Sequence, residues 1–434
     1  MKKINKNYTY YEYQNSHEMF AALDDFLKLG YVICDSIFLC VELVKNNDYV
    51  LLSYIHISNP NENIKTQIKA LYTPCEVIYP NYDNTLLNVI SEIRNNYGYD
   101  AKYRSFNLFD KPYSKVVLMI LDGLGTNVLN SNLDSNSFLR KNFVNSCQAI
   151  FPSTTACATT TIKSGLTPIS TAWLGWENYL KELNRNVVLF TGVNYYNDEP
   201  TGVLPVKYIP YNMFYDDMDV DGFVVEPDFS NPKYKFDDLL KKSLNINHKY
   251  PKSIQYVYYQ EPDGLLHSYG CYSLQVKDFL KEIDNKIKNY ANSLDDDTIL
   301  IISADHGHTD VNPIDFYACK PLLRLLKRPP SNDSRCITFS VIKSKEEEFE
   351  KLFNILFGSI YRLYKSQDAI DMGFFGNKSD LINPRSYDFL ADYVAIANNK
   401  YYFNYKSIDN HIFKSHHGGI TKDEMIIPIC IFRK

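Results

Sequence analysis

Four apolar runs rich in β-branched residues constrain the fold of this chain more than any other feature of its sequence. The runs are VVLMIL (116–121), NVVLFTG (186–192), IQYVYYQEPD (254–263) and TILIISADHG (298–307). Segments compatible with helices, such as 272–293, separate them. Continuous apolar strands that alternate with helices are typical of parallel sheets covered on both faces. The sequence therefore predicts an α/β fold built on a doubly wound, mostly parallel sheet.

Three of the four runs lead into an aspartate, at Asp122, Asp263 and Asp305. Ligands of doubly wound sheets bind at the carboxyl ends of the strands, which all three aspartates would reach. Histidine follows two of them closely, as His267 and His306. One aspartate at a strand end is ordinary loop chemistry, but three with adjacent histidines indicate a shared site.

The histidines give this site the character of a metal centre. An Asp-His pair places oxygen and nitrogen ligands side by side, which suits zinc. Asp263 and His267 are four residues apart and would project from the same side of a helical turn. His417 precedes two glycines, where the backbone can approach a ligand closely. Each pattern alone also fits a polar surface turn, so the metal hypothesis depends on their combination.

A nucleophile candidate comes from the segment FPSTTACATTTIKSG (151–165), whose small and hydroxyl residues could open a helix. Thr155 would lie in the first turn, where backbone N–H groups and the helix dipole favour a phosphate or an alkoxide. Thr154 is the alternative nucleophile. A run of threonines at a helix start can also serve only as a cap.

Composition excludes several other kinds of protein. The chain of 434 residues has 46 Lys and Arg against 51 Asp and Glu, a net charge of −5, so no broad positive field is available to hold a nucleic acid polymer or an anionic membrane. Its nine cysteines are dispersed and form no CxxC pair, which favours reduced thiols. The N-terminus has no apolar segment typical of a signal peptide, so we expect a cytoplasmic protein without a membrane segment.

The chain divides by pattern into an N-terminal extension, residues 1–78, without a chemical motif, and a catalytic domain, residues 79–434. A less regular stretch at about 312–410 is expected to form a cap-like insertion with its own small α/β unit. The last apolar run, 425–432, would return to the main sheet. Because Pro428 cannot donate a backbone hydrogen bond, it predicts an edge position or a bulge there.

The ordered set of candidate residues resembles the alkaline phosphatase superfamily, and within it the type I phosphodiesterase/nucleotide pyrophosphatase family. In chain order the set is Asp122, Thr155, Asp263, His267, Asp305, His306 and His417. The likeness covers about residues 79–434 and includes YPNYDNTLLNVISEIRNNYG (79–98) and HHGGITKDEM (416–425). These segments are similar to a bacterial subgroup described as alkaline phosphatase family proteins.

The resemblance implies two divalent metal ions, expected to be Zn²⁺ with Mn²⁺ as the alternative. Asp263, His267 and His417 would bind one ion, and Asp122, Asp305 and His306 the other, with Thr155 bridging toward the second. It also implies attack of Thr155 on phosphorus, a phosphothreonyl intermediate, and release by metal-activated water. Three carboxylates and two dications nearly cancel once the threonine is ionised, so a small anionic phosphate ester could bind without a basic protein.

This chain departs from the family pattern at positions that are expected to contact substrate. Ala156 follows Thr155 where nucleotide-cleaving members carry an aromatic residue. Trp176 stands at the spacing of a phosphoryl-binding asparagine, and Asn178 follows as a substitute. We expect both to contact substrate, with Trp173 and Tyr179 as further wall residues, although tryptophans also commonly pack between a helix and a sheet.

The substrate class is narrowed by two absences from the sequence. No arginine of the monoesterase type stands beside Thr155, and no Cys/Ser-x-Pro-x-Arg motif of the sulfatase type is present, so phosphodiesters or pyrophosphates are favoured. The alternatives are a phosphomonoesterase or phosphotransferase of the same superfamily, and a catalytically idle metal-binding protein that engages a partner through residues 1–78. His308 and His416 could support the metal ligands or be ordinary polar residues. The oligomeric state is not predicted.

Overall fold

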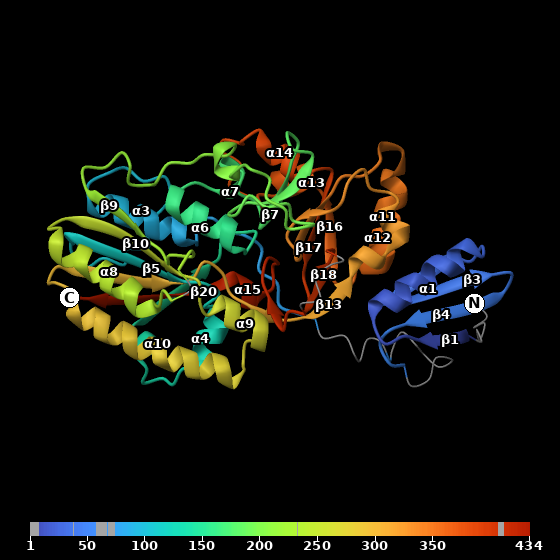
Figure 1. Ribbon diagram of the computed structural model, residues 1–434, viewed down its shortest axis with the longest axis horizontal. Helices are drawn as coiled ribbons and strands as arrows, with labels where there is room; N and C mark the ends of the chain where they lie inside the picture. The colour runs from blue at the N-terminus through green and yellow to red at the C-terminus, as the bar shows by residue number, and fades with distance from the viewer. Residues whose placement is uncertain (1–7, 38, 58–66, 68–73, 232, 407–411) are drawn as a thin grey trace. The chain divides into compact units, whose positions relative to one another are not determined.

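The computed structural model describes residues 8–37, 39–57, 67, 74–231, 233–406 and 412–434 and consists of two compact units (Figure 1). The large unit comprises Val77–Val311, Ile370–Phe389 and Phe413–Lys434. The small unit comprises Met1–Glu76, Asn312–Ala369 and Leu390–Ile412. Each unit is therefore formed by three separate segments of the chain.

A six-stranded, mostly parallel sheet forms the centre of the large unit, in the order β6-β20-β11-β5-β10-β9. The strands β11, β5, β10 and β9 are parallel neighbours, whereas β20 is antiparallel to both β11 and β6. The bounds are β5 (Lys115–Leu121), β6 (Phe143–Gln148), β9 (Asp221–Val225), β10 (Ser253–Tyr259), β11 (Thr298–Ser303) and β20 (Ile426–Arg433). The predicted α/β fold with a doubly wound, mostly parallel sheet is confirmed.

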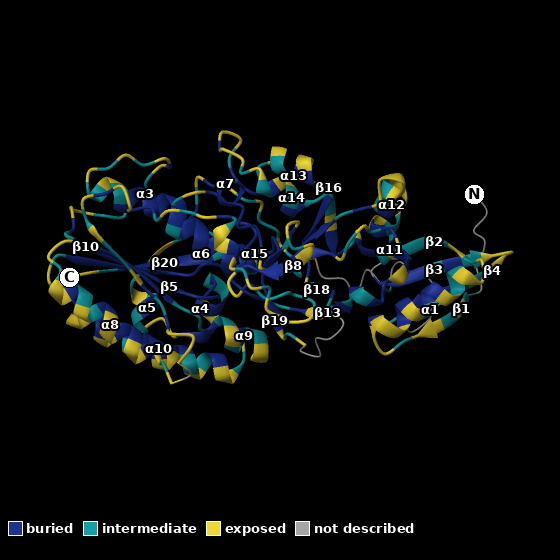
Figure 2. Cartoon of the chain, turned by 45° about the horizontal axis from the view of Figure 1, so that its top comes forward, coloured by how far each residue is buried: buried dark blue, intermediate teal, exposed yellow. Residues whose placement is uncertain are grey.

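Helices cover both faces of this sheet, with α3 and α6 on one side and α8 and α10 on the other (Figure 1). Every residue of β5 and β11 is buried, while the outer faces of α8 and α10 are exposed (Figure 2). This burial explains why those two strands are continuously apolar. The helices are α3 (Leu86–Asn96), α6 (Thr155–Ser164), α8 (Phe236–Lys249), α10 (Leu274–Ser293) and the shorter α4 (Thr126–Asn132), α5 (Phe138–Lys141), α7 (Pro168–Thr171), α9 (Asp263–Tyr269) and α15 (Lys422–Met425).

One strand prediction was wrong and one was confirmed. The run 186–192 does not join the main sheet: its strand, β8 (Arg185–Val188), pairs antiparallel with β7 (Glu177–Leu180). A tight turn with Asn184 at φ 51° connects β7 and β8. The run therefore pairs with the strand nearest to it in sequence. The last apolar run returns to the main sheet as β20, as predicted. Of the two alternatives for Pro428, the irregularity is observed and not the edge position, because the pairing of β20 with β6 shifts register between Ile429 and Cys430.

The small unit contains an N-terminal sheet of order β1-β4-β3-β2 and a group of four strands of order β16-β17-β15-β14. Its strands are β1 (Tyr8–Glu12), β2 (Val32–Ile37), β3 (Cys40–Lys45), β4 (Asp48–Ser53), β13 (Asn312–Asp315), β14 (Ser331–Asn332), β15 (Cys336–Phe339), β16 (Tyr361–Lys365), β17 (Tyr393–Ala397) and β18 (Tyr401–Asn404). Its helices include α1 (Ser16–Lys28), α11 (Lys320–Leu323) and α12 (Glu346–Phe357).

The N-terminal helix α1 packs against the segment inserted after residue 311. Phe20 and Phe357 have ring centroids 5.8 Å apart, and both side chains are buried. Arg324 donates two hydrogen bonds to the carboxylate of Asp24, at 2.6 and 2.9 Å. The N-terminal extension and the insertion, which were expected as separate parts, are joined by these contacts within one unit.

In the described part of the chain, no helix is both long and apolar enough to cross a membrane. The nine cysteines all lie within the described residues and form no disulfide bond, and seven of them are buried.

Replacing Phe20 with alanine should destabilise the small unit. Phe20→Ala leaves a cavity against Phe357, and the loss of a buried phenylalanine costs about 3–5 kcal/mol. Leu29→Ala, at the end of the same helix where the side chain is 63% exposed, should change stability by less than about 0.5 kcal/mol. Hydrogen–deuterium exchange of peptides from α1 and α12 measures both effects. Equal protection in the two variants would contradict the packing of α1 on α12.

Candidate active site

The register of the central sheet brings the predicted aspartates together at the carboxyl ends of its strands. Ser303 of β11 pairs with Ile120 of β5, so Asp305 and Asp122, each two residues further on, lie side by side. The backbone N–H of Asp263, after β10, donates a 3.0 Å hydrogen bond to the carbonyl of Asp122. Three neighbouring parallel strands thus deliver three carboxylates to one place.

One group of potential metal ligands consists of Asp122, Asp305 and His306, here called the Asp122 cluster. His306 Nε2 lies 3.3 Å from Asp122 Oδ1 and 3.5 Å from Asp305 Oδ2. Backbone N–H groups of Gly123 and His306 donate to Asp305 Oδ1 at 3.1 and 3.0 Å. Its other oxygen, Oδ2, is buried and has no hydrogen-bond partner among the described residues. A buried carboxylate oxygen without a partner is costly unless a cation binds it.

A second group consists of Asp263, His267, His308 and His417, here called the Asp263 cluster. Asp263 and His267 lie one turn apart on α9. The short strands β12 (Thr309–Asp310) and β19 (Ser415–His416) pair antiparallel and bring His308 and His417 together. The ligand atoms of the four residues all lie within 4.8 Å of one another. The rings of His306 and His417 stack with centroids 3.8 Å apart, which links the two clusters.

Hydrogen bonds to the backbone fix the orientation of three of the imidazole rings. The Nδ1 atoms of His267, His306 and His417 contact the carbonyl oxygens of Ser415, Gly307 and Ser153 at 2.9, 3.1 and 3.0 Å. Because a carbonyl oxygen only accepts, each Nδ1 carries a proton, which leaves Nε2, on the side of the carboxylates, as the ring atom able to bind a cation. Metal-bound histidines are typically oriented in this way by a hydrogen bond from the other nitrogen.

The electrostatics of both clusters favour a bound cation. Burial raises the pKa of Asp122 well above its ordinary value, and the charges of Asp305 and Asp263 raise it further. Burial also raises the pKa of Asp305. Burial, followed by the neighbouring histidines, holds the pKa of His417 well below its usual range, and burial lowers that of His308 to about 4. Clustered carboxylates and neutral imidazoles form a donor set suited to a divalent metal such as zinc.

Thr155 is the first residue of α6 and faces the Asp122 cluster. Its Oγ1 lies 3.2 Å from His306 Nε2 and 3.4 Å from Asp122 Oδ2. The N-terminal end of a helix carries partial positive charge, which favours an ionised hydroxyl there. Thr154, the preceding residue, is fully buried and is not among the residues that line the cavity beside the clusters. Thr155 therefore contacts the Asp122 cluster and lines the cavity, whereas Thr154 does not line the cavity.

Two glycines allow the loops of the site to approach each other. Gly123 has φ +74°, and a Cβ atom there would lie 2.9 Å from His308 Cδ2 and 3.2 Å from the Cα of Asp263. A Cβ atom at Gly307 would lie 2.1 Å from the carbonyl oxygen of Asp423. Any larger residue at either position would push the ligand-bearing loops apart.

A cavity of about 690 Å³ opens beside Thr155 and is walled mainly by apolar and aromatic side chains. The Trp173 ring lies 5.7 Å from that of Phe190, which in turn lies 5.9 Å from that of Trp176. The lining residues are Asp122, Thr155, Thr159, Lys163, Trp173, Trp176, Leu189, Phe190, Thr191, Leu204, Val206, Tyr211, Glu226, Phe229, Tyr258, Gln260, Glu261, Asp263 and Gly264. Substrate groups larger than the phosphoryl group fit such a space.

The structure separates the predicted substrate residues. Trp176 lines the cavity and is 39% exposed. Asn178 is fully buried in β7 and is not among the lining residues, and neither is Tyr179. Trp176 precedes β7, whereas Asn178 and Tyr179 lie within the strand, where pairing with Val187 and Asn186 of β8 fixes their positions. Lys163, which had no predicted role, forms an ion pair with Glu226, and both residues line the cavity.

Several polar residues that support the site were not assigned by sequence reasoning. Tyr258 donates a short hydrogen bond to Asp122. Ser153 donates to the carbonyl of Gly419 at 2.8 Å and accepts from the N–H of Gly418 at 3.1 Å, which ties the His417 loop to the Thr155 loop. Ser415 contacts His308 Nδ1 at 3.0 Å. Only their closeness in sequence to the candidate residues could have indicated them.

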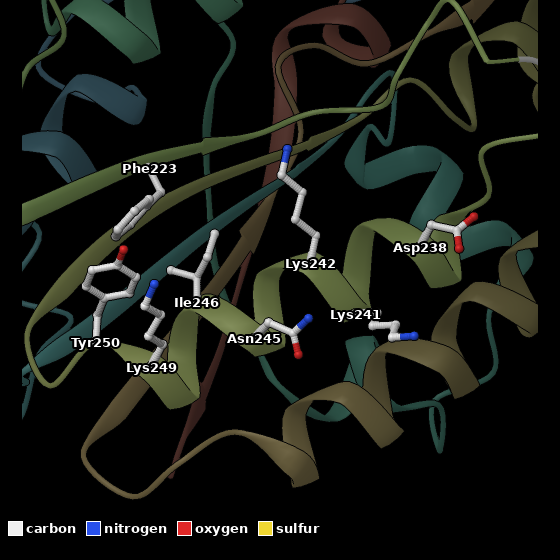
Figure 3. Close-up of a pocket in the computed structure, with 8 residues that line it drawn as sticks. All are labelled: Phe223, Asp238, Lys241, Lys242, Asn245, Ile246, Lys249 and Tyr250. Carbon is white, nitrogen blue, oxygen red and sulfur yellow. The ribbon is translucent and has the colours of Figure 1, made fainter.

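A separate groove of about 420 Å³ lies over α8 and contains none of the site residues (Figure 3). Phe223 and Tyr250 lie at one end of it with ring centroids 4.6 Å apart. Lys241, Lys242 and Lys249 come from the helix.

The ordered ligands and the parallel sheet agree with a sequence comparison. The sequence model of the type I phosphodiesterase / nucleotide pyrophosphatase family matches residues 116–420. The chain belongs to this family. It is therefore a hydrolase of the phosphodiesterase/pyrophosphatase type, as the resemblance predicted. The residues of this type I phosphodiesterase family member that match the model include Asp122, Thr155 and the candidate metal ligands that follow them in the chain. No curated protein sequence matches the chain significantly.

Solved structures of the alkaline phosphatase superfamily share this fold at low sequence identity. An inactive variant of murine ectonucleotide pyrophosphatase/phosphodiesterase 5 in complex with AMP is 18% identical, with a TM-score of 0.56, and the match covers 73% of this chain and 87% of that chain. Phosphonoacetate hydrolase from Sinorhizobium meliloti in complex with phosphonoformate is 13% identical, with a TM-score of 0.55, and the match covers 74% and 91%. At this identity the likeness shows the fold.

A divalent cation bound at the two clusters is expected to stabilise this family member more at high pH than at low pH. Because the pKa values of Asp122 and Asp305 are raised in the folded chain, both carboxyls keep protons there that the unfolded chain releases above about pH 4. This contribution to stability is lost as the pH rises through the folded pKa values, and a cation then replaces the protons. The difference in Tm between zinc-loaded and chelator-treated protein should therefore be larger at pH 8 than at pH 5.

Differential scanning calorimetry across this range measures the difference. Asp278→Asn, which removes an exposed carboxylate on α10, should leave the pH trend unchanged. A difference in Tm that is constant from pH 5 to pH 8 would contradict the link between cation binding and these protons.

Proposed function

We propose that this chain is a two-metal hydrolase of phosphodiester or pyrophosphate bonds with Thr155 as its nucleophile. The observation that carries the proposal is the position of Thr155 Oγ1, which lies 3.2 Å from His306 Nε2 and also faces the large cavity. A hydroxyl placed between a metal-type ligand cluster and a substrate-sized space is suited to attack phosphorus. The structural neighbours that bind AMP and phosphonoformate support a phosphoryl-containing ligand.

The two clusters have distinct parts in the proposed mechanism. Asp263, His267 and His417 would hold one cation, and Asp122, Asp305 and His306 the other, next to Thr155. Two divalent ions, proposed to be Zn²⁺ with Mn²⁺ as the alternative, would neutralise the carboxylates and polarise the phosphoryl oxygens when bound.

The chain itself would prepare the nucleophile. Asp122 and His306 surround Thr155 Oγ1, and the N-terminal end of α6 stabilises negative charge on it. Attack on phosphorus would form a phosphothreonyl intermediate and expel the alcohol or phosphate leaving group. Water would then cleave the Thr155 ester and return the hydroxyl to its original state.

The cavity indicates the kind of ester that would bind. Trp173, Trp176 and Phe190 offer ring faces and edges, so one substituent on phosphorus is expected to be an apolar or aromatic organic group. Lys163 is neutralised by Glu226 and gives no unpaired positive charge for a dianionic phosphoryl group. This pairing favours small-molecule diesters over monoesters. Trp176 is the residue proposed to contact substrate. Asn178 is buried and does not line the cavity, so it is not proposed as a substrate contact.

Removing the Thr155 hydroxyl should abolish turnover. Thr155→Ala should lower kcat/KM for bis(4-nitrophenyl) phosphate about 1000-fold or more, because it removes the hydroxyl that contacts His306. Thr154→Ala should retain most activity, since its side chain lies outside the cavity. Assays with zinc or manganese measure both variants, and mass spectrometry of acid-quenched enzyme detects phosphothreonine. Equal activity of Thr155→Ala and the unmodified chain would overturn the proposed mechanism.

The same assay separates the alternative enzyme class. The proposal expects faster hydrolysis of the diester than of 4-nitrophenyl phosphate. A preference for the monoester would instead support a phosphomonoesterase, and transfer to an added alcohol would support a phosphotransferase. Absence of turnover with bound metal would favour an idle metal-binding protein.

Truncating Trp176 should weaken binding of aromatic esters specifically. Trp176→Ala removes a ring that lines the cavity, so KM for an aryl phosphodiester should rise about 3- to 10-fold. KM for an ester that has methyl as its retained group should change little. Tyr272→Ala, which alters a 55% exposed aromatic residue outside the cavity lining, serves as the control. An equal rise for both esters would show that Trp176 does not select the organic group.

A further inference from the structure

We propose that His308 is a fourth protein ligand of the cation held by the Asp263 cluster. The family resemblance supplies three ligands there, Asp263, His267 and His417, and leaves His308 without a role. The inference rests on the proposed metal-dependent function but concerns a residue outside the resemblance. Three independent geometric observations support it.

The first observation is the direction of the hydrogen bonds around Ser415. The Ser415 hydroxyl donates to the carbonyl oxygen of Leu266 at 2.7 Å. A hydroxyl has a single proton, so toward His308 Nδ1, 3.0 Å away, the Ser415 oxygen acts as an acceptor. The His308 ring therefore carries its proton on Nδ1. In the neutral ring, Nε2 then presents a lone pair and is the atom able to bind a cation.

The second observation is what this lone pair faces. His308 Nε2 lies 2.6 Å from Asp263 Oδ1. The Nε2 atoms of His267 and His417 lie 3.4 and 3.6 Å from the same oxygen. A nitrogen lone pair and a carboxylate oxygen repel each other at such a distance when no proton lies between them. A cation shared by the carboxylate and the three imidazoles converts this repulsion into attraction.

The third observation is that the ring is held in place from several sides. The His308 side chain is fully buried. Asn127 Nδ2 donates to its backbone carbonyl at 2.9 Å. Gly123 leaves space for the ring, because a Cβ atom there would lie 2.9 Å from His308 Cδ2. A residue that is packed and oriented in this way does not need to move to bind a metal.

A fourth ligand changes what the Asp263 cluster can do. Zinc with four protein ligands resembles a closed structural site, whereas catalytic zinc usually keeps one position open. The cation of this cluster would then be held tightly and would accept a substrate oxygen only as a fifth ligand. The Asp122 cluster, with its three protein ligands and adjacent Thr155, would be the more open of the two.

A crystal structure of the zinc-loaded full chain, with anomalous scattering at the zinc edge, tests the assignment directly. The expected result is His308 Nε2 within about 2.0–2.1 Å of the ion held by Asp263. A bound ion with His308 more than 3 Å away would overturn the inference and leave the proposed function intact. Absence of zinc from both clusters would overturn both.

Metal affinity supplies a second readout. In competition with a chelator, His308→Ala should bind one of its two zinc ions more than about 100-fold more weakly, exceeding the 10- to 100-fold loss typical of residues that only orient a ligand. His248→Gln is the control, because it replaces an exposed histidine of α8 that belongs to neither cluster, and it should keep both affinities. Unchanged affinity in a folded His308→Ala protein would contradict direct ligation. X-ray absorption spectroscopy of the unmodified chain, which counts imidazole ligands, requires no variant and decides the case if His308→Ala fails to fold.

Discussion

The rest of the structure is arranged around three carboxylates and four imidazoles that are kept close together and away from water. Such a set is unfavourable by itself, because buried carboxylates repel one another and an unpaired oxygen such as Asp305 Oδ2 loses its hydration. The fold resists this repulsion with rigid elements. The pairing of β5, β10 and β11 fixes the three aspartates, and hydrogen bonds to backbone carbonyls fix the rings of His267, His306 and His417. The repulsion that the protein scaffold sustains is what gives the site its affinity for positive charge.

Local sequence patterns predicted this part of the molecule well. Asp122 and Asp305 follow continuous apolar strands, and position at the end of a parallel strand is a strong constraint on where a side chain lies. Thr155 was selected by its place at a helix start, which α6 confirms. The four-residue spacing of Asp263 and His267 reflects a single turn of α9. In each case one element of secondary structure, visible in sequence, determines the position.

The features that the sequence did not predict depend on which segments meet. The run 186–192 has the composition of a core strand, but its strand β8 pairs with β7, which precedes it across a tight turn. Asn178 lies only two residues from Trp176, yet it is buried away from the cavity. The hydrogen bond from Tyr258 to Asp122 connects residues 136 positions apart, and that between Arg324 and Asp24 connects residues 300 apart. Such contacts depend on shape and charge complementarity between distant segments, which single-residue patterns do not encode.

The packing of α1 on α11 and α12 also sets an order of events during synthesis. Helix α1 leaves the ribosome early, with Met19, Phe20 and Leu23 ready to be buried, but its partners in the insertion follow some 300 residues later. At about 5–20 residues per second, the ribosome needs on the order of 15–60 s to produce them. During this interval the side of α1 that carries Phe20 lacks its partner Phe357. The small unit can therefore be completed only after most of the large unit has already emerged.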